Sequence, residues 1–183
     1  MPAFRKLLSI GCLISYDAGA EMTEPLFLVE SEDSSLFSTE ADRRQFSLLF
    51  NGIESADDLP AQSQADLIAS YWREQAGICF PENDAIRLIT IWFNGSDPYS
   101  GNDRCILHCG HAAVLVQAAD NEVLLLEKLS YDFPFQLIRF PSEDAALDYI
   151  VEFNCGETEG SEILPVVFVN DKPLRAEGGR FVY

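Results

Sequence analysis

The stretch that decides the fold is "RCILHCGHAAVLVQAADNEVLLLEKLSY", residues 104–131. It consists of an apolar run over 104–117, a short turn segment over 118–121 and a second apolar run over 122–131. Two such runs joined by a short turn are typical of a β-hairpin. Gly110 interrupts the first run, and a glycine inside a strand indicates a bulge or a close approach of another backbone. We therefore predict a long, locally irregular hairpin.

Further strands and helices are predicted on both sides of this hairpin. Residue types that favour strands predict β-structure for "AIRLITIWF" (85–93), "PFQLIRF" (134–140) and "ILPVVFVND" (163–171), with a shorter strand at 24–30. Helical spacing and helix-end residues such as Thr39, Gly77 and Ser142 predict helices at 3–16, 39–53, 63–77 and 142–154.

The order of these elements predicts an α+β fold. N-terminal helices come first, an antiparallel β-meander follows, and one helix and one strand close the chain. We expect the helices to pack against one face of the sheet. A length of 183 residues suits a single domain, with a mainly helical part at 1–77 and the sheet plus one helix at 78–183.

The charge balance excludes several classes of partner. The chain has 30 acidic and 12 basic residues, a net charge of −18, and nucleic-acid binding needs clustered Lys and Arg. The same charge disfavours anionic membrane surfaces, and no apolar run approaches the roughly 18–20 residues of a membrane span. The five cysteines follow no disulfide spacing, so we expect reduced thiols and a cytoplasmic location.

The predicted hairpin brings a histidine near a carboxylate. If the chain turns at 118–121, His111 falls opposite Glu127 or Lys128, and opposed side chains lie about 5 Å apart at Cβ. A carboxylate beside an imidazole fixes its tautomer and raises its basicity. Such a pair is the base and orienting group of a thiol or hydroxyl nucleophile system. The alternative is a structural His–Glu pair that takes part in no reaction.

A metal site is a weaker interpretation of the same strand. On a regular strand Cys105, Cys109 and His111 point one way and His108 the other, unless Gly110 bulges and resets the alternation. This spacing matches no established zinc pattern, and one straight strand spreads the ligands too far apart. We predict no metal and no other cofactor, and we interpret these cysteines as small buried apolar residues.

The segment "RKLLSIGCLISYD" (5–17) allows three interpretations. A lipoprotein signal needs an apolar region of about 7–15 residues, whereas only five residues separate Lys6 from Cys12, and Ser9 occupies a position where an aliphatic residue is usual. A catalytic thiol in a papain-like layout opens its helix, whereas Cys12 falls near the end of the helix predicted at 3–16, where the dipole disfavours a thiolate. Cys79 is a weaker nucleophile candidate. We favour the third interpretation, a core helix with a buried thiol.

Several segments together resemble a bacterial family known only as a domain of unknown function, many of whose members are small lipoproteins. The most specific element is Gly-His, an apolar strand and then "LLLEKLSYDFPFQ" (124–136), similar to the family's G-H-x-G-V-L-V and F-x-E-K-L-x-F-x-x-P-Y-Q. The matching segments are "YWREQAGICF" (71–80), "AIRLITIWF" (85–93), "CGHAAVLVQAADNEVLLLEKLSYDFPFQLIRF" (109–140) and "EDAALDYI" (143–150), and the motif positions are His111, Glu127, Lys128, Pro134 and Gln136.

This resemblance implies a papain-like or NlpC-like fold and a thiol hydrolase. The family also carries an Asn-Cys-Arg motif that opens an earlier helix. His111 would be the base, Glu127 the orienting group and Gln136 a polar site contact. Cys12 is then the candidate nucleophile, although "IGCLIS" (10–15) has Gly for Asn and Leu for Arg.

A second alignment sets the Asn-Cys-Arg motif upstream of Met1. The chain would then lack its nucleophile, and the protein would be a cell-envelope lipoprotein. Two functions follow: a cysteine hydrolase of amide or peptide bonds that acts on a peptide or small molecule, and a non-catalytic binding module on the same fold.

Overall fold

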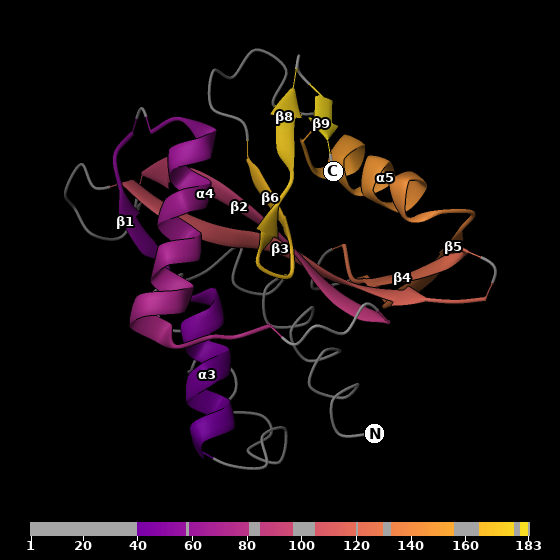
Figure 1. Cartoon of the computed structure of the whole chain (residues 1–183), viewed down its shortest axis with the longest axis horizontal. Helices are drawn as coiled ribbons and strands as arrows, with labels where there is room; N and C mark the ends of the chain where they lie inside the picture. The colour runs from indigo at the N-terminus through magenta and orange to yellow at the C-terminus, as the bar shows by residue number, and fades with distance from the viewer. Residues whose placement is uncertain are drawn as a thin grey trace.

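The computed structural model describes residues 40–57, 59–80, 85–96, 105–119, 121–129, 133–155, 165–177 and 180–182. The helix predicted at 3–16, with Cys12, and the strand predicted at 24–30 lie outside these residues. Figure 1 shows an antiparallel sheet with helices α3 and α4 at the left and helix α5 at the upper right, above strands β4 and β5. An α+β fold is therefore confirmed.

A seven-stranded antiparallel sheet organises the chain. The predicted meander is confirmed, since β2, β3, β4 and β5 are consecutive neighbours in the order β5-β4-β3-β2-β6-β7, while β1 pairs with the start of β3. A two-stranded sheet of β8 and β9 stands apart from this order. The strands are β1 (Ile53–Ser55), β2 (Ile86–Ser96), β3 (Cys105–Gln117), β4 (Val123–Glu127), β5 (Gln136–Phe140), β6 (Val166–Val169), β7 (Lys172–Pro173), β8 (Arg175–Glu177) and β9 (Arg180–Val182).

The helices begin and end close to their predicted limits. They are α3 (Glu40–Phe50), α4 (Ala61–Ser70), its π-helical continuation η2 (Tyr71–Ala76) and α5 (Glu143–Cys155). Gly77 ends η2 in the left-handed conformation at φ 62°, and the Ser142 hydroxyl caps α5 by accepting a 3.2 Å bond from the Ala145 amide. The predicted end of the helical segment 39–53 at Asn51-Gly52 is confirmed, since α3 stops at Phe50, and Ile53 begins β1.

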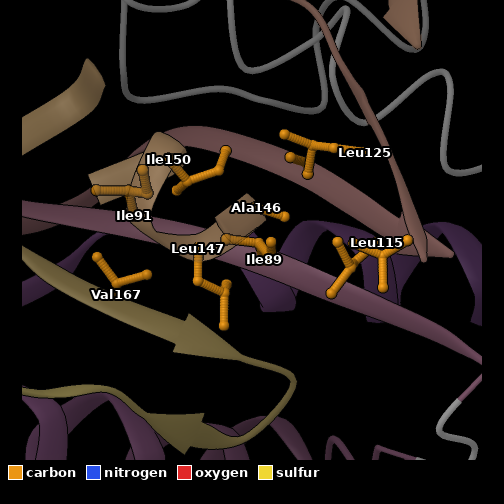
Figure 2. Close-up of a cluster of buried hydrophobic side chains, with 10 residues drawn as sticks. Ile89, Ile91, Leu115, Leu125, Ala146, Leu147, Ile150 and Val167 are labelled. Carbon is orange, nitrogen blue, oxygen red and sulfur yellow. The ribbon is translucent and has the colours of Figure 1, made fainter. Parts of the chain in front are cut away.

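Helices cover both faces of the sheet, which corrects the expectation that they share one face. Ile89 and Ile91 of β2 pack with α5 in one core cluster, which Figure 2 shows with side chains of β3, β4 and β6 converging on the helix. Trp92, the next residue, points the other way and packs on Trp72 of η2, with ring centroids 5.8 Å apart. Because β2 is apolar at both alternating positions, each of its faces needs a helical cover.

Gly110 marks a β-bulge, as its place in the strand predicted. Ile91 pairs with His111, but the next residue, Trp92, pairs with Cys109, so Gly110 has no cross-strand partner. The Phe93 ring fills the space over Gly110, where an added Cβ would lie 2.7 Å from Phe93 Cδ2. The bulge resets the alternation of side chains, so Cys109 lies in the cluster of Trp92 and His111 lies on the α5 face beside Ile91.

Replacing Gly110 with alanine tests this packing. We expect Gly110→Ala to lower the free energy of unfolding by about 1–3 kcal/mol, because the new methyl group overlaps the Phe93 ring. Gly95→Ala is the matched control on the partner strand, since its Cβ would meet nothing nearer than His108 Cε1 at 3.9 Å. Denaturant unfolding measures both variants, and equal stabilities would contradict the packing account.

Candidate functional site

Four polar side chains from four elements meet beneath α5 at the end of strand β4. His111 Nε2 lies 3.0 Å from Glu127 Oε2. The other carboxylate oxygen, Oε1, accepts bonds from Gln136 Nε2 at 2.7 Å and from the Tyr149 hydroxyl at 2.9 Å. Gln136 Nε2 also lies 3.3 Å from the Tyr149 oxygen. The structure thus brings together three of the predicted site residues, His111, Glu127 and Gln136, and adds Tyr149.

The His111–Glu127 contact is diagonal and not directly cross-strand. The ladder pairs Gln117 with Val123 and therefore Ala113 with Glu127, so the prediction that His111 stands opposite Glu127 or Lys128 was wrong by one or two residues. His111 and Ala113 are two residues apart and share a face of the sheet. A long side chain reaches such a diagonal neighbour, and the predicted proximity holds although the register does not.

The pKa of Glu127 determines which atoms carry protons. Burial alone raises the pKa of this carboxyl, which is 1% exposed, but the hydrogen bond and charge of His111, with the bonds from Tyr149 and Gln136, outweigh burial and lower it. An ionised carboxylate only accepts hydrogen bonds, so each neighbouring group must donate. His111 Nε2 therefore carries a proton. Within the described part of the chain, this is the one ring hydrogen bond of His111, which leaves Nδ1 for another group.

Tyr149 is the site residue that sequence reasoning missed. Burial, followed by the hydrogen bond and the charge of Glu127, raises the pKa of its hydroxyl to about 12, so it stays a donor at neutral pH. Its segment, "EDAALDYI", is part of the family resemblance, and a phenol on the flank of an apolar helix was the available signal. Its partner could not be identified because the strand it faces depends on how α5 docks.

The thiols that the structure describes, those of Cys79, Cys105 and Cys109, do not bond the imidazole. Cys109 Sγ donates to the backbone oxygen of His111 at 3.2 Å, and burial raises the pKa of this thiol to about 12. Cys105 Sγ donates to Asp57 Oδ1 at 3.3 Å, whereas Cys79 is exposed. Cys12 lies outside the described residues.

A metal centre is not found among the described residues, where no three His, Cys, Asp or Glu side chains are grouped to hold an ion. The bulge accounts for this on β3, because it separates Cys109 and His111 onto opposite faces. No helix of the described part is long and apolar enough to cross a membrane.

Glu127 should make the stability of the fold depend on pH. Its folded pKa lies below the ordinary value of 4.5, so its stabilisation is present above about pH 4.5 and is lost as pH falls through the folded pKa. We expect Glu127→Gln to lose about 1–3 kcal/mol of unfolding free energy at pH 7 and to show a flatter acid dependence. Denaturant unfolding from pH 3 to 7 measures this.

The control is Glu152→Gln, which removes an exposed carboxylate from α5. It should keep the acid dependence of the wild-type chain. If Glu127→Gln also keeps that dependence, Glu127 is not the group responsible.

Comparison with known proteins adds one finding. A family model described as "Domain of unknown function (DUF4300)" matches residues 24–174, which include all four side chains of the site but not Cys12. No curated protein and no solved structure matches the chain. The match confirms the predicted resemblance to a family of unknown function and spans well over half of the sequence, so the chain belongs to the DUF4300 family.

Proposed function

We propose that this chain is a papain-like cysteine hydrolase of amide or peptide bonds, in which His111 is the base and Glu127 orients it. The observation that supports this proposal is the bond between His111 Nε2 and Glu127 Oε2 at 3.0 Å. A carboxylate that holds one ring nitrogen fixes the tautomer and leaves Nδ1 as the basic nitrogen. This arrangement supplies the base and orienting group that a thiol nucleophile requires.

The reaction would follow the usual course of thiol hydrolysis, with Cys12 as the candidate nucleophile. The thiol gives its proton to His111 Nδ1, and the thiolate attacks the carbonyl carbon of the substrate. The C–N bond then breaks, and the leaving amine takes the proton from the imidazolium that Glu127 stabilises. Water hydrolyses the thioester, which releases the acid and restores the thiol.

Gln136 is the polar site contact in this proposal. Its amide nitrogen is bonded to Glu127 Oε1 and to the Tyr149 oxygen. In the proposed enzyme Gln136 therefore acts through Glu127, which it helps to hold. The substrate, a peptide or a small molecule, would meet the Nδ1 side of His111.

The second candidate is a non-catalytic binding module on the same fold. Two observations favour it: His111 is 7% exposed, and Cys109, two residues before it in the sequence, has a pKa raised by burial to about 12. In that case the buried His–Glu pair serves to fix the end of β4 against α5.

Thiol labelling distinguishes the two functions. At pH 6 we expect an alkylating probe to modify Cys12 at least about ten-fold faster than Cys79, because an imidazole-paired thiol is ionised at that pH. His111→Asn should abolish this excess rate. Peptide mass spectrometry of the intact wild-type chain and of the variant measures the rate at each cysteine.

Cys79 and Cys109 are internal controls for this labelling. The exposed Cys79 gives the rate of an ordinary accessible thiol, and the buried thiol of Cys109 should react more slowly than Cys79. A Cys12 rate equal to that of Cys79, unchanged by His111→Asn, would favour the binding module.

A further inference from the structure

We propose that Tyr149 is a positioning residue that selects Nδ1 of His111 as the reactive nitrogen. This inference rests on the proposed function, because it names a group that prepares the same base. Tyr149 contacts neither a nucleophile nor a substrate in this account. It acts through Glu127, by occupying the carboxylate oxygen that does not face the imidazole.

The two carboxylate oxygens of Glu127 have different hydrogen-bond partners. Oε1 accepts two bonds, from Tyr149 at 2.9 Å and from Gln136 at 2.7 Å, while Oε2 accepts the bond from His111. Both oxygens are therefore engaged at the same time. Rotation of the carboxylate about its last torsion, which is soft in an unconstrained side chain, would break the two bonds to Oε1.

The hydrogen bonds among Gln136, Tyr149 and Glu127 have a definite donor and acceptor at each contact. Gln136 must present its amide nitrogen, because its partner Oε1 can only accept, and that nitrogen lies within bonding distance of the Tyr149 oxygen as well. The Tyr149 oxygen is thus an acceptor toward Gln136, and its single proton points at Glu127. Because the hydroxyl pKa is raised to about 12, that proton remains in place at neutral pH.

Packing against neighbouring side chains holds the Tyr149 ring in place. The Tyr149 ring contacts the rings of Phe140 and Phe153, at centroid distances of 5.3 and 6.0 Å. Its helix is anchored by Leu147 and Ile150, which are 1% and 0% exposed. The Tyr149 hydroxyl is therefore held in place, and its hydrogen bond to Oε1 restrains the orientation of the Glu127 carboxylate.

The consequence concerns the imidazole. With Glu127 held, Oε2 offers one acceptor to the ring, and Nε2–H is the tautomer that fills it. Without the Tyr149 hydroxyl, Oε1 keeps a single donor and the carboxylate can turn. The imidazole can then also bond through Nδ1, which removes that nitrogen from the reaction.

The experiment is nitrogen-15 NMR of the histidine rings at pH 7 in the full chain carrying Cys12→Ser, because a Cys12 thiolate would keep the imidazole doubly protonated and hide its tautomer. The sequence holds only two histidines, His108 and His111, so the spectrum can be assigned with His108→Asn. In the Cys12→Ser chain with Tyr149 intact we expect His111 in the Nε2–H form alone. In Tyr149→Phe we expect a detectable Nδ1–H fraction, and solvent exchange of the Nε2 proton faster by about ten-fold, as for loss of one charge-assisted bond.

The matched control is Tyr71→Phe. Tyr71 is a buried tyrosine, whereas Tyr149 is half-buried, and the Tyr71 hydroxyl accepts a bond from Asn51 Nδ2 far from the α5 face. This variant should leave the His111 signals unchanged. The His108 signals should be the same with and without each tyrosine substitution. If Tyr149→Phe fails to fold by circular dichroism, Gln136→Met loosens the same carboxylate oxygen without altering α5 and should produce the same tautomer mixture.

Two outcomes would overturn the inference: an unchanged His111 spectrum in folded Tyr149→Phe, or an equal change in Tyr71→Phe. The tautomer readout does not depend on catalysis. A slow Cys12 in the labelling experiment would thus refute the hydrolase while the role of Tyr149 toward His111 is still measured. Fast, His111-dependent labelling with an unchanged tautomer in Tyr149→Phe would support the hydrolase and refute the positioning role.

Discussion

A carboxylate that is removed from water needs hydrogen-bond donors, and the buried Glu127 of β4 takes them from three other elements of the fold. Its 1% exposure would cost several kcal/mol if its oxygens were unpaired. Strands β3 and β5 and helix α5 each supply a donor to it, so the end of β4, the edge of the sheet and the helix are joined at one point. The same bonds that satisfy the carboxylate also define the tautomer of His111.

The β-bulge at Gly110 is the second constraint on the site. A regular strand would place His111 on the same face as Cys109, among the apolar side chains beneath α4 and η2. The extra residue turns His111 toward α5 instead, where Glu127 ends its strand. The bulge therefore creates the His–Glu pair, and it removes Cys109 from reach of the imidazole ring. The Phe93 ring fills the space that a side chain at position 110 would take.

Much of the fold could be predicted, because its elements have clear local signals. The strands at 104–117 and 134–140 and the helix at 142–154 were predicted within about two residues of their observed limits. Strand β1 was not predicted, because three residues show no detectable periodicity. The position of α5 on the opposite face was missed because both faces of β2 are apolar. The proximity of His111 to Glu127 was predicted from the hairpin, but its diagonal geometry depended on a register that the turn segment left open by one or two residues.

The sequence by itself determined the hairpin, the place of the bulge and the presence of a histidine and a glutamate near each other, because alternation and turn residues act over short distances along the chain. The tertiary structure alone decided that Tyr149 and Gln136 share one oxygen of Glu127 and that His111 faces α5. Those contacts join residues that are not related by the periodicity of a helix or of a strand, so no local sequence pattern predicts them. They follow from the way α5 packs over the sheet, which is set by the fit of Ala146, Leu147 and Ile150 against the strands below (Figure 2).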